Sequence, residues 1–207
     1  MLHLTDVTVL WGMSASITEG LYLASQSPRR VALLSQLGLF PSILAAEIEE
    51  IWLPNESPQA FVERMARGKA NAGMLALGDK RGVVIAADTE VVLDGDVFGK
   101  PLDPEHARSM LSRLSGRTHS VISAVCLLDA SEESLAISIS EVDFATLAPA
   151  DIDSYIATGE PFGKAGAYAV QGQAASFISA IRGSYSGIMG LPLFETAQLL
   201  RARMNRA

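Results

Sequence analysis

Short apolar segments and longer amphipathic segments follow one another along the chain. The apolar segments are rich in Val, Ile, Leu and Ala and are bounded by turn-forming residues, as the strands of a buried sheet are. They comprise residues 21–24, 83–87, 90–93, 119–128, 135–147, 167–170 and 177–181. Asp94 and Gly95 have the sequence of a tight turn, so a hairpin is expected at residues 93–97.

Prolines mark where the helices are expected to begin. Ser27-Pro28, Ser57-Pro58 and Asp103-Pro104 each place a capping side chain before a proline, which loses no hydrogen bond at the first helical position. Pro149 and Pro192 are expected to open two more helices. Hairpins mixed with β–helix–β units favour a mixed sheet with helices on its faces, so the predicted fold class is α/β or α+β. A cleft is expected where strand ends meet helix starts.

Composition limits the classes of protein that fit. Of the 207 residues 49% are hydrophobic, and 16 basic against 23 acidic side chains give a net charge of −7. Such a chain buries a sizeable core, so we expect one globular domain, or at most two closely apposed lobes, rather than disorder. The acidic balance disfavours a general nucleic-acid or anionic-membrane binder, because those proteins usually carry a basic surface. An anionic ligand must therefore bind at a local basic site.

The chain shows no sign of export or of membrane insertion. Residues 1–20 lack the cationic and apolar regions of a secretory signal, and no run of about 18 apolar residues occurs. The single cysteine, Cys126, lies in an apolar segment and has no partner for an internal disulfide. We therefore expect a cytoplasmic protein.

The first candidate site is the sequence Ser25-Gln26-Ser27-Pro28-Arg29-Arg30, between an apolar strand and a helix. A helix N-terminus offers free backbone N–H groups and a partial positive charge, and here two serines and two arginines are added to it. Together they favour a phosphate site. An ordinary capped helix with two solvated arginines is the alternative.

Lysine usage and acidic residues provide further candidates. Only four of the 16 basic residues are lysines, and Lys69 lies on the apolar stripe of its predicted helix, where an ammonium needs an anionic partner or must reach out to solvent.

Asp88 ends the apolar run 83–87, a position where catalytic acids are commonly mounted, although it can also act as a structural cap. If a carboxylate from residues 47–50 converged on Asp88, the pair could hold Mg²⁺.

Several motifs, in register along the chain, are shared with one known family. They are Ser25-Gln26-Ser27-Pro28-Arg29-Arg30, Ala87-Asp88-Thr89, Gly99-Lys100-Pro101, Leu114-Ser115-Gly116-Arg117-Thr118-His119, the segment 164–172 and Gly190-Leu191-Pro192-Leu193. On these motifs the chain closely resembles the Maf family of nucleoside triphosphate pyrophosphatases, once described as septum-formation inhibitors. The resemblance covers residues 21–207 as one domain and leaves residues 1–20 as an N-terminal extension.

The resemblance implies both a fold and a reaction. The fold would be an elongated mixed β-sheet flanked by helices, with two lobes around a cleft, similar to inosine triphosphate pyrophosphatase. The reaction would be hydrolysis of a nucleoside triphosphate between the α and β phosphates with a divalent cation, Mg²⁺ or Mn²⁺, by a protein that is often a homodimer.

The resemblance also implies roles for particular residues. Asp88 matches the proposed proton acceptor, and with Glu49 it would hold the metal. Lys69 and Lys100 would neutralise charge on the phosphates. The residues expected to bind the substrate or select it are Ser27, Arg29, Arg30, Thr89 and Gln171.

Within the family the chain looks like the subgroup acting on dTTP and UTP. The sister subgroup, similar to 7-methyl-GTP pyrophosphatases, tends to carry tryptophan after the proline and glutamine after the aspartate, where this chain has Arg29 and Thr89. A glutamine such as Gln171 suits thymine and uracil, since its amide satisfies an N3–H donor and an O4 acceptor together. Two alternatives remain: the same chemistry on 7-methyl-GTP or other modified nucleotides, and a non-catalytic nucleotide-binding regulator of septum formation.

Overall fold

Long antiparallel strands form the middle of the molecule in the computed structural model, which describes residues 20–205. β3 (Val83–Leu93), β5 (Thr118–Leu128) and β6 (Glu133–Phe144) pair along most of their length. β3 and β5 bury almost every side chain, as expected for apolar strands covered on both faces. Residues 83–87 and 90–93, expected as two strands, are therefore parts of one. The expected extension, residues 1–20, lies outside the described residues except for Gly20.

The sheet is mixed, as predicted. Among the described residues its order is β2-β1-β3-β5-β6-β7, with β4 paired to β3. β1 (Leu21–Leu23) runs parallel to both β2 (Ser42–Ile43) and β3, and helices separate these strands along the chain. β4 (Asp96–Phe98) and β7 (Ile178–Arg182) are antiparallel to their neighbours, and β3 and β4 form the expected hairpin.

The helices begin close to the prolines that predict them. Proline is the first residue of α1 (Pro28–Gln36), α2 (Pro58–Leu77), α3 (Pro104–Leu114) and α4 (Pro149–Ala157). The side chains of Ser57 and Asp103 cap α2 and α3 through the N–H groups of Ala60 and His106. Pro192 instead stands directly before α6 (Leu193–Met204).

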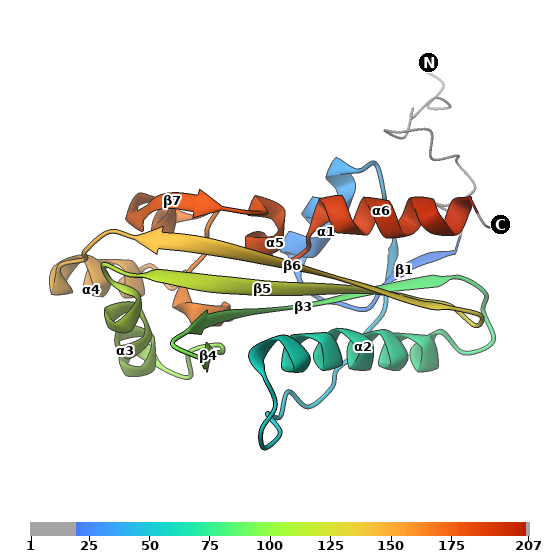
Figure 1. Cartoon of the computed structure of the whole chain (residues 1–207), viewed down its shortest axis with the longest axis horizontal. Helices are drawn as coiled ribbons and strands as arrows, with labels where there is room; N and C mark the ends of the chain where they lie inside the picture. Colours follow the sequence, from blue (N-terminus) through green and yellow to red (C-terminus); the bar gives the residue numbers. More distant parts are fainter. Residues whose placement is uncertain (1–19, 206–207) are drawn as a thin grey trace, which may run out of the picture.

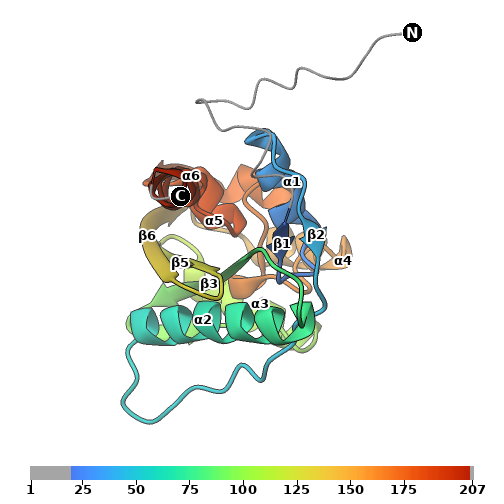
Figure 2. The same ribbon diagram turned by 90° about the vertical axis from the view of Figure 1, so that its right-hand side faces the viewer.

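Helices cover both faces of the sheet (Figure 1). α2 packs on one face against β3 and β5, while α5 (Tyr185–Met189) and α6 pack on the other against β5 and β6. Figure 2 shows the same layers end-on, with α1 on the side of α5 and α6. None of the helices in the described part of the chain is long and apolar enough to cross a membrane.

Separate apolar clusters stabilise the two ends of the elongated sheet. One cluster joins α3 and α4 to the ends of β3, β5 and β6, and includes Leu111, Tyr155 and Tyr168. Two further clusters join α1, α2 and α6 to β1 and the remaining parts of these strands. The long strands run through both ends, so two closely apposed lobes share one sheet.

The edge of β3 changes partners between the lobes. Residues 83–85 pair with β1 and residues 91–93 pair with β4, while β5 pairs with the other edge throughout. Beyond Leu23 the chain leaves the sheet to begin α1, and beyond Phe98 it leaves β4 toward α3. Residues 86–90 therefore have a strand neighbour on one side only, and we call them the open edge of β3.

One expected strand is absent. At residues 167–170 the chain instead ends a short 3₁₀ helix, Ala165–Ala167, in which Gly166 and Ala167 have positive φ angles of 68° and 60°. Two consecutive residues in this conformation turn the chain too sharply for a strand. Residues 168–170 instead line a cavity beside the start of α1.

Candidate active site

A cavity of about 610 Å³ opens along the open edge of β3. It is lined by the start of α1, the segment after Ala46, α2, Lys100, the segment around Gln171 and the end of α5. Its size suits a nucleotide-sized ligand. The cavity therefore lies where strand ends meet helix starts, as the sequence predicts.

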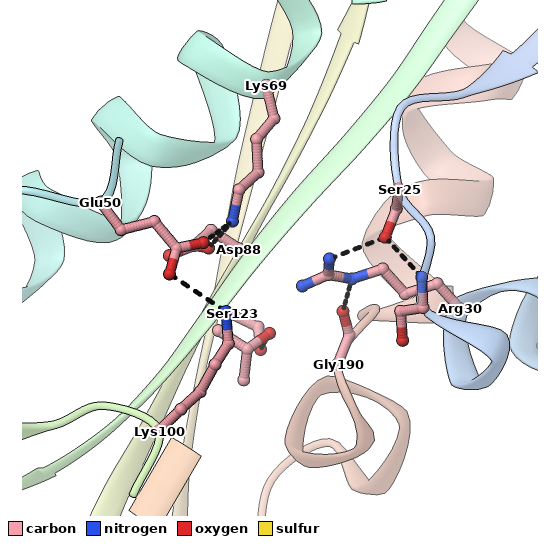
Figure 3. Close-up of polar contacts among 10 residues, drawn as sticks. Ser25, Arg30, Glu50, Lys69, Asp88, Lys100, Ser123 and Gly190 are labelled. Carbon is pink, nitrogen blue, oxygen red and sulfur yellow. Dashed lines mark hydrogen bonds and ion pairs between the residues drawn. The ribbon is translucent and has the colours of Figure 1, made fainter. Parts of the chain in front are cut away.

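The start of α1 is tied to α5 through an arginine. Arg30 donates from Nε to the carbonyl of Gly190 at 2.8 Å and from Nη1 to Ser25 Oγ at 3.1 Å (Figure 3). Ser25 Oγ also accepts the N–H of Ser27 at 3.2 Å. Burial lowers the pKa of Arg30, and the carboxylates of Asp88 and Glu50 partly offset this. The positive charge of Arg30 is thus held in place at the N-terminus of α1.

Ser27 and Arg29 line the cavity beside Arg30. The hydroxyl of Ser27 does not cap its own helix, so it remains available to a ligand. Burial lowers the pKa of Arg29, for which the described part of the chain records no hydrogen bond or ion pair. The first turn of α1 thus offers backbone N–H groups, a hydroxyl and two guanidinium groups to an anion.

Facing α1, two lysines and two carboxylates form a chain of ion pairs. Lys69 Nζ donates to Asp88 Oδ1 at 2.6 Å and to Glu50 Oε1 at 2.7 Å, and Lys100 Nζ donates to Glu50 Oε2 at 3.1 Å. Figure 3 shows the two lysines approaching Glu50 from different elements, with Asp88 beside it. Burial acts to raise the pKa of Glu50, but the hydrogen bonds and charges of both lysines hold it below its usual value. These are strong, charge-assisted contacts.

Asp88 stands on the open edge of β3 and is only 4% exposed. Lys69 binds its Oδ1, whereas its Oδ2 is buried with no hydrogen-bond partner among the described residues. A buried carboxylate oxygen without a partner is costly unless a ligand, water or cation completes it. The arrangement therefore presents one oxygen of Asp88 to an incoming group.

Glu90 lies two residues further along β3 and also lines the cavity. Its Oε2 is likewise buried without a partner in the described structure. Burial, with the negative charges of Asp88 and Glu50, raises the pKa of Glu90 to about 8. At neutral pH this carboxyl group is mostly protonated, so it adds little repulsion toward a polyanion.

Thr89 and Gln171 line the cavity as expected. Ser123 donates its hydroxyl proton to the carbonyl of Gly187 at 2.7 Å, so in the 2.7 Å contact between Thr89 Oγ1 and Ser123 Oγ the donor is Thr89. The hydroxyl of Thr89 therefore offers a ligand only its acceptor lone pairs. The side chain of Gln171 is exposed in the cavity wall with its amide unpaired in the described residues.

Glu49 is not placed as expected. It is exposed and does not line the cavity, whereas its neighbour Glu50 binds both Lys69 and Lys100. Ala46 and Ile48 pack against the core, and in an extended chain every second side chain shares a face, which places Glu50 with them and Glu49 on the other side. This alternation was the signal in the sequence that could have identified Glu50.

Sequence reasoning also passed over Ser25, Glu90 and Lys164 as individual site residues. Glu90 shares the β-strand periodicity of Asp88, so an acid two residues away was a usable signal. Lys164 Nζ donates to the carbonyls of Glu160 and Phe162 at 2.8 and 3.2 Å, and burial together with the charge of Arg29 lowers its pKa. Lysines and arginines contribute five cations to the cavity against four acidic residues, in a protein of net charge −7.

Within the described residues no group of three or more His, Cys, Asp or Glu side chains is placed to hold a metal ion. The acidic side chains that line the cavity are Glu47, Glu50, Asp88 and Glu90, of which Glu90 is mostly protonated at neutral pH because its pKa is raised to about 8. Carboxylate oxygens suit Mg²⁺ or Mn²⁺, which bind to proteins through one or two carboxylates and complete their shells with water and phosphate oxygens.

Comparison with known proteins identifies the family. The family model described as Maf-like protein matches residues 20–203. This chain belongs to the Maf family. A protein named dTTP/UTP pyrophosphatase from Methylococcus capsulatus is 51% identical over 181 residues, covering 87% of this chain and 89% of that protein. Proteins of the same name from Burkholderia pseudomallei and Xanthomonas campestris are 52% and 50% identical and cover 87% and 88% of this chain and 92% and 97% of their own lengths.

Among solved structures, that of the Ham1 protein of Staphylococcus aureus shares 15% sequence identity with this Maf-family chain. It covers 61% of this chain and 72% of its own, with a TM-score of 0.43.

Proposed function

We propose that this Maf-family chain hydrolyses dTTP and UTP to the nucleoside monophosphate and pyrophosphate. Relatives of about 50% identity that match it over nearly their whole length carry that name. The observation that carries the proposal is the buried, unpartnered Oδ2 of Asp88, held beside Lys69 in a cavity that is rich in cations. Hydrolysis of a phosphoanhydride needs this combination of charge neutralisation and an oriented water more than a covalent nucleophile.

The cations of the cavity bind the triphosphate. The first turn of α1 supplies backbone N–H groups and the hydroxyl of Ser27, and Arg30 adds a fixed positive charge. The side chain of Lys100 is 58% exposed and, among the described residues, is bound through Glu50 alone, so it reaches a phosphate oxygen with a small side-chain motion. Lys69 is more buried and stays between Asp88 and Glu50, where it offsets charge that develops on the phosphates.

Asp88 positions the attacking water and takes its proton. Its Oδ1 is occupied by Lys69, so the carboxylate is fixed in orientation and only Oδ2 accepts a hydrogen bond from water.

A divalent cation fits the same group of residues. Glu50, rather than Glu49, would hold Mg²⁺ or Mn²⁺ together with Asp88, which would act through the water that it positions, and the substrate's phosphates would add further oxygen ligands. When bound, such a cation neutralises phosphate charge and lowers the pKa of a coordinated water. The unpartnered Oδ2 of Asp88 supports this placement.

Gln171 selects the base. Thymine and uracil present an N3–H donor beside the O4 acceptor, and a carboxamide satisfies both, whereas cytosine reverses that pattern. Arg29 and Thr89 line the same cavity and add contacts to the nucleotide. Thr89 contributes only as an acceptor, because its proton is committed to Ser123.

The test is pyrophosphate release from a panel of triphosphates with Mg²⁺, Mn²⁺ or neither. We expect release from dTTP and UTP that depends on a divalent cation. The panel includes dCTP, dATP, dGTP and 7-methyl-GTP. No release from any of them would leave only a binding role and overturn the enzymatic proposal, and preference for a purine would overturn the choice of base. The homodimer and the cytoplasmic location stay predictions.

A further inference from the structure

The wall of the cavity that carries Gln171 has little regular structure to hold it. Residues 168–172 lie between two short 3₁₀ helices, Ala165–Ala167 and Gln173–Phe177. Just before them, Gly166 and Ala167 both adopt left-handed conformations, which is unfavourable for alanine. Contacts from elsewhere in the protein must therefore fix the backbone on which Gln171 is mounted.

Two residues outside the cavity supply those contacts. Glu160, in the turn after α4, accepts the N–H of Gln173 on Oε2 at 3.0 Å and the N–H of Ala174 on Oε1 at 3.3 Å. Tyr155 Oη donates to Glu160 Oε1 at 2.8 Å and accepts the N–H of Ala169 at 3.2 Å. The Tyr155–Glu160 pair therefore binds the backbone on both sides of Gln171.

The chemistry of the pair suits this task. Burial acts to raise the pKa of Glu160, but the N–H of Gln173, the hydroxyl of Tyr155 and the N–H of Ala174 together hold it below its usual value. The group is therefore a carboxylate that only accepts hydrogen bonds. Tyr155 is 3% exposed, and its ring packs against Phe177 with centroids 5.2 Å apart, so its hydroxyl is held in place.

Packing restricts the same segment. A Cβ atom at Gly172 would lie 2.3 Å from Oε1 of Glu160 and 2.4 Å from its Cδ and Oε2. The carboxylate thus lies directly against the backbone of the residue that follows Gln171. Lys164, which directly precedes the 3₁₀ helix at Ala165, donates to the backbone carbonyl of Glu160. The turn that carries Glu160 is therefore bound to the chain both before and after Gln171.

We propose that Glu160 and Tyr155 are positioning residues that set base selection by fixing the backbone around Gln171. Neither residue lines the cavity, so both act through Gln171 and not on the nucleotide. The inference rests on the proposed function, in which Gln171 recognises thymine or uracil. The phosphate-binding groups lie on α1, α2, β3 and the loop after β4, and the Tyr155–Glu160 pair does not contact them.

The variants Glu160→Gln and Tyr155→Phe test this role with little change in volume. The first replaces one acceptor oxygen with a donor, and the second removes the hydroxyl but keeps the packed ring. We expect kcat/KM for dTTP to fall about tenfold in each, which corresponds to one lost hydrogen bond, while kcat/KM for dCTP changes less than about twofold. The double variant should lose little more than either single variant, because the residues act as a unit.

Glu141→Gln is the matched control. Its carboxylate also accepts a hydrogen bond, from Arg182 at 2.7 Å, but between β6 and β7 and away from the cavity. We expect this variant to keep the wild-type ratio of dTTP to dCTP. The ratio is independent of the folded fraction, since both substrates meet the same enzyme. An unchanged ratio in Tyr155→Phe and Glu160→Gln would overturn the proposal.

Amide hydrogen exchange separates this inference from the proposed function. Exchange at residues 169–174 should accelerate in Glu160→Gln and Tyr155→Phe but not in Glu141→Gln, whether or not dTTP is the substrate. Wild-type protein that fails to hydrolyse dTTP would overturn the proposed function. Wild-type exchange rates in both variants would overturn the positioning role.

Discussion

The ammonium of Lys69 lies 2.6 Å from Oδ1 of Asp88, joining α2 to the open edge of β3. The two side chains are only 13% and 5% exposed, so the pair is held largely away from solvent. This contact orients the carboxylate and leaves its second oxygen unpartnered in the described structure. A helix and a strand from distant parts of the chain thereby present one carboxylate oxygen to the cavity.

Replacing Asp88 with asparagine should abolish most turnover without unfolding the protein. The amide keeps an oxygen for Lys69 but cannot take a proton from water, so we expect kcat to fall by about 10²- to 10⁴-fold. Lys69 retains Glu50 as a charged partner, which limits the loss of stability. Pyrophosphate release from dTTP measures the rate, and thermal unfolding confirms the fold. Near-normal turnover in Asp88→Asn would remove Asp88 from the reaction.

Glu49 and Glu50 form a matched pair for mutation. Glu50→Gln removes the charge that binds both lysines, and we expect activity to fall about tenfold or more, as for loss of a charged hydrogen bond. Glu49→Gln changes an exposed side chain outside the cavity and should alter kcat/KM less than about twofold. Divalent-cation titrations on both variants show whether Glu50 also supports metal binding. Equal losses in the two variants would contradict the placement of Glu50.

Local rules predict much of this fold and of its site. Serine–proline and aspartate–proline pairs predict where α1, α2 and α3 begin, because capping is decided by neighbouring residues. The acid that follows the apolar run 83–87 draws attention to Asp88, although the strand continues through it to Leu93 and does not end there. The family motifs, which occur in the same order along the chain, add Lys100 and Gln171. The periodicity of apolar residues alone does not distinguish these two residues from surface residues.

Tertiary contacts decide the rest. The alternation of Ala46, Ile48 and Glu50 in the sequence separates Glu50 from Glu49, but the packing of Ile48 on the core decides that the face carrying Glu50 meets the two lysines. The segment 167–170 has a strand-like composition, but the backbone angles of Gly166 and Ala167 redirect it into the cavity wall. Apolar composition alone does not encode such a turn.

His119 should make stability depend on pH. Burial lowers its pKa to about 4, although Asp143 acts in the opposite direction, and its Nε2 hydrogen-bonds to Tyr168 Oη at 2.8 Å. The unfolded chain takes up a proton on this histidine near pH 6.5 and the folded protein only near pH 4. Its contribution to stability is therefore complete above pH 6.5 and is lost as the pH falls toward 4.

His119→Gln removes this titration. Between pH 6.5 and 4 the free energy of unfolding should then fall less steeply with decreasing pH than in the wild type. The two slopes should differ by at most about 1.4 kcal/mol per pH unit. Urea unfolding of both proteins at several pH values measures the slopes, and the difference at pH 7.5 accounts for altered packing. If the free energies of unfolding of wild type and variant changed with pH in parallel, the lowered pKa of His119 would be contradicted.

Two glycines in α2 should respond oppositely to the same substitution. A Cβ at Gly73 would lie 2.7 Å from Val84 Cγ1 and 2.8 Å from the Cβ of Ala24, both of which are buried in the same apolar cluster. Gly73→Ala must push α2 away from β3, so we expect it to lower the free energy of unfolding by about 1–3 kcal/mol. Because Lys69 lies one turn earlier on the same face, its contact with Asp88 should weaken and activity should fall as well.

At Gly68 the added Cβ would meet only the tip of Ile48, at 2.8 Å from Cδ1, and that flexible side chain can move. Alanine favours a helix interior over glycine by about 1 kcal/mol, so Gly68→Ala should raise the free energy of unfolding by up to that amount. Chemical denaturation of the two variants under identical conditions tests the pair, and dTTP turnover reports whether Lys69 has moved. If Gly73→Ala were as stable and active as Gly68→Ala, close packing of α2 on β3 would not be what holds Lys69 at Asp88.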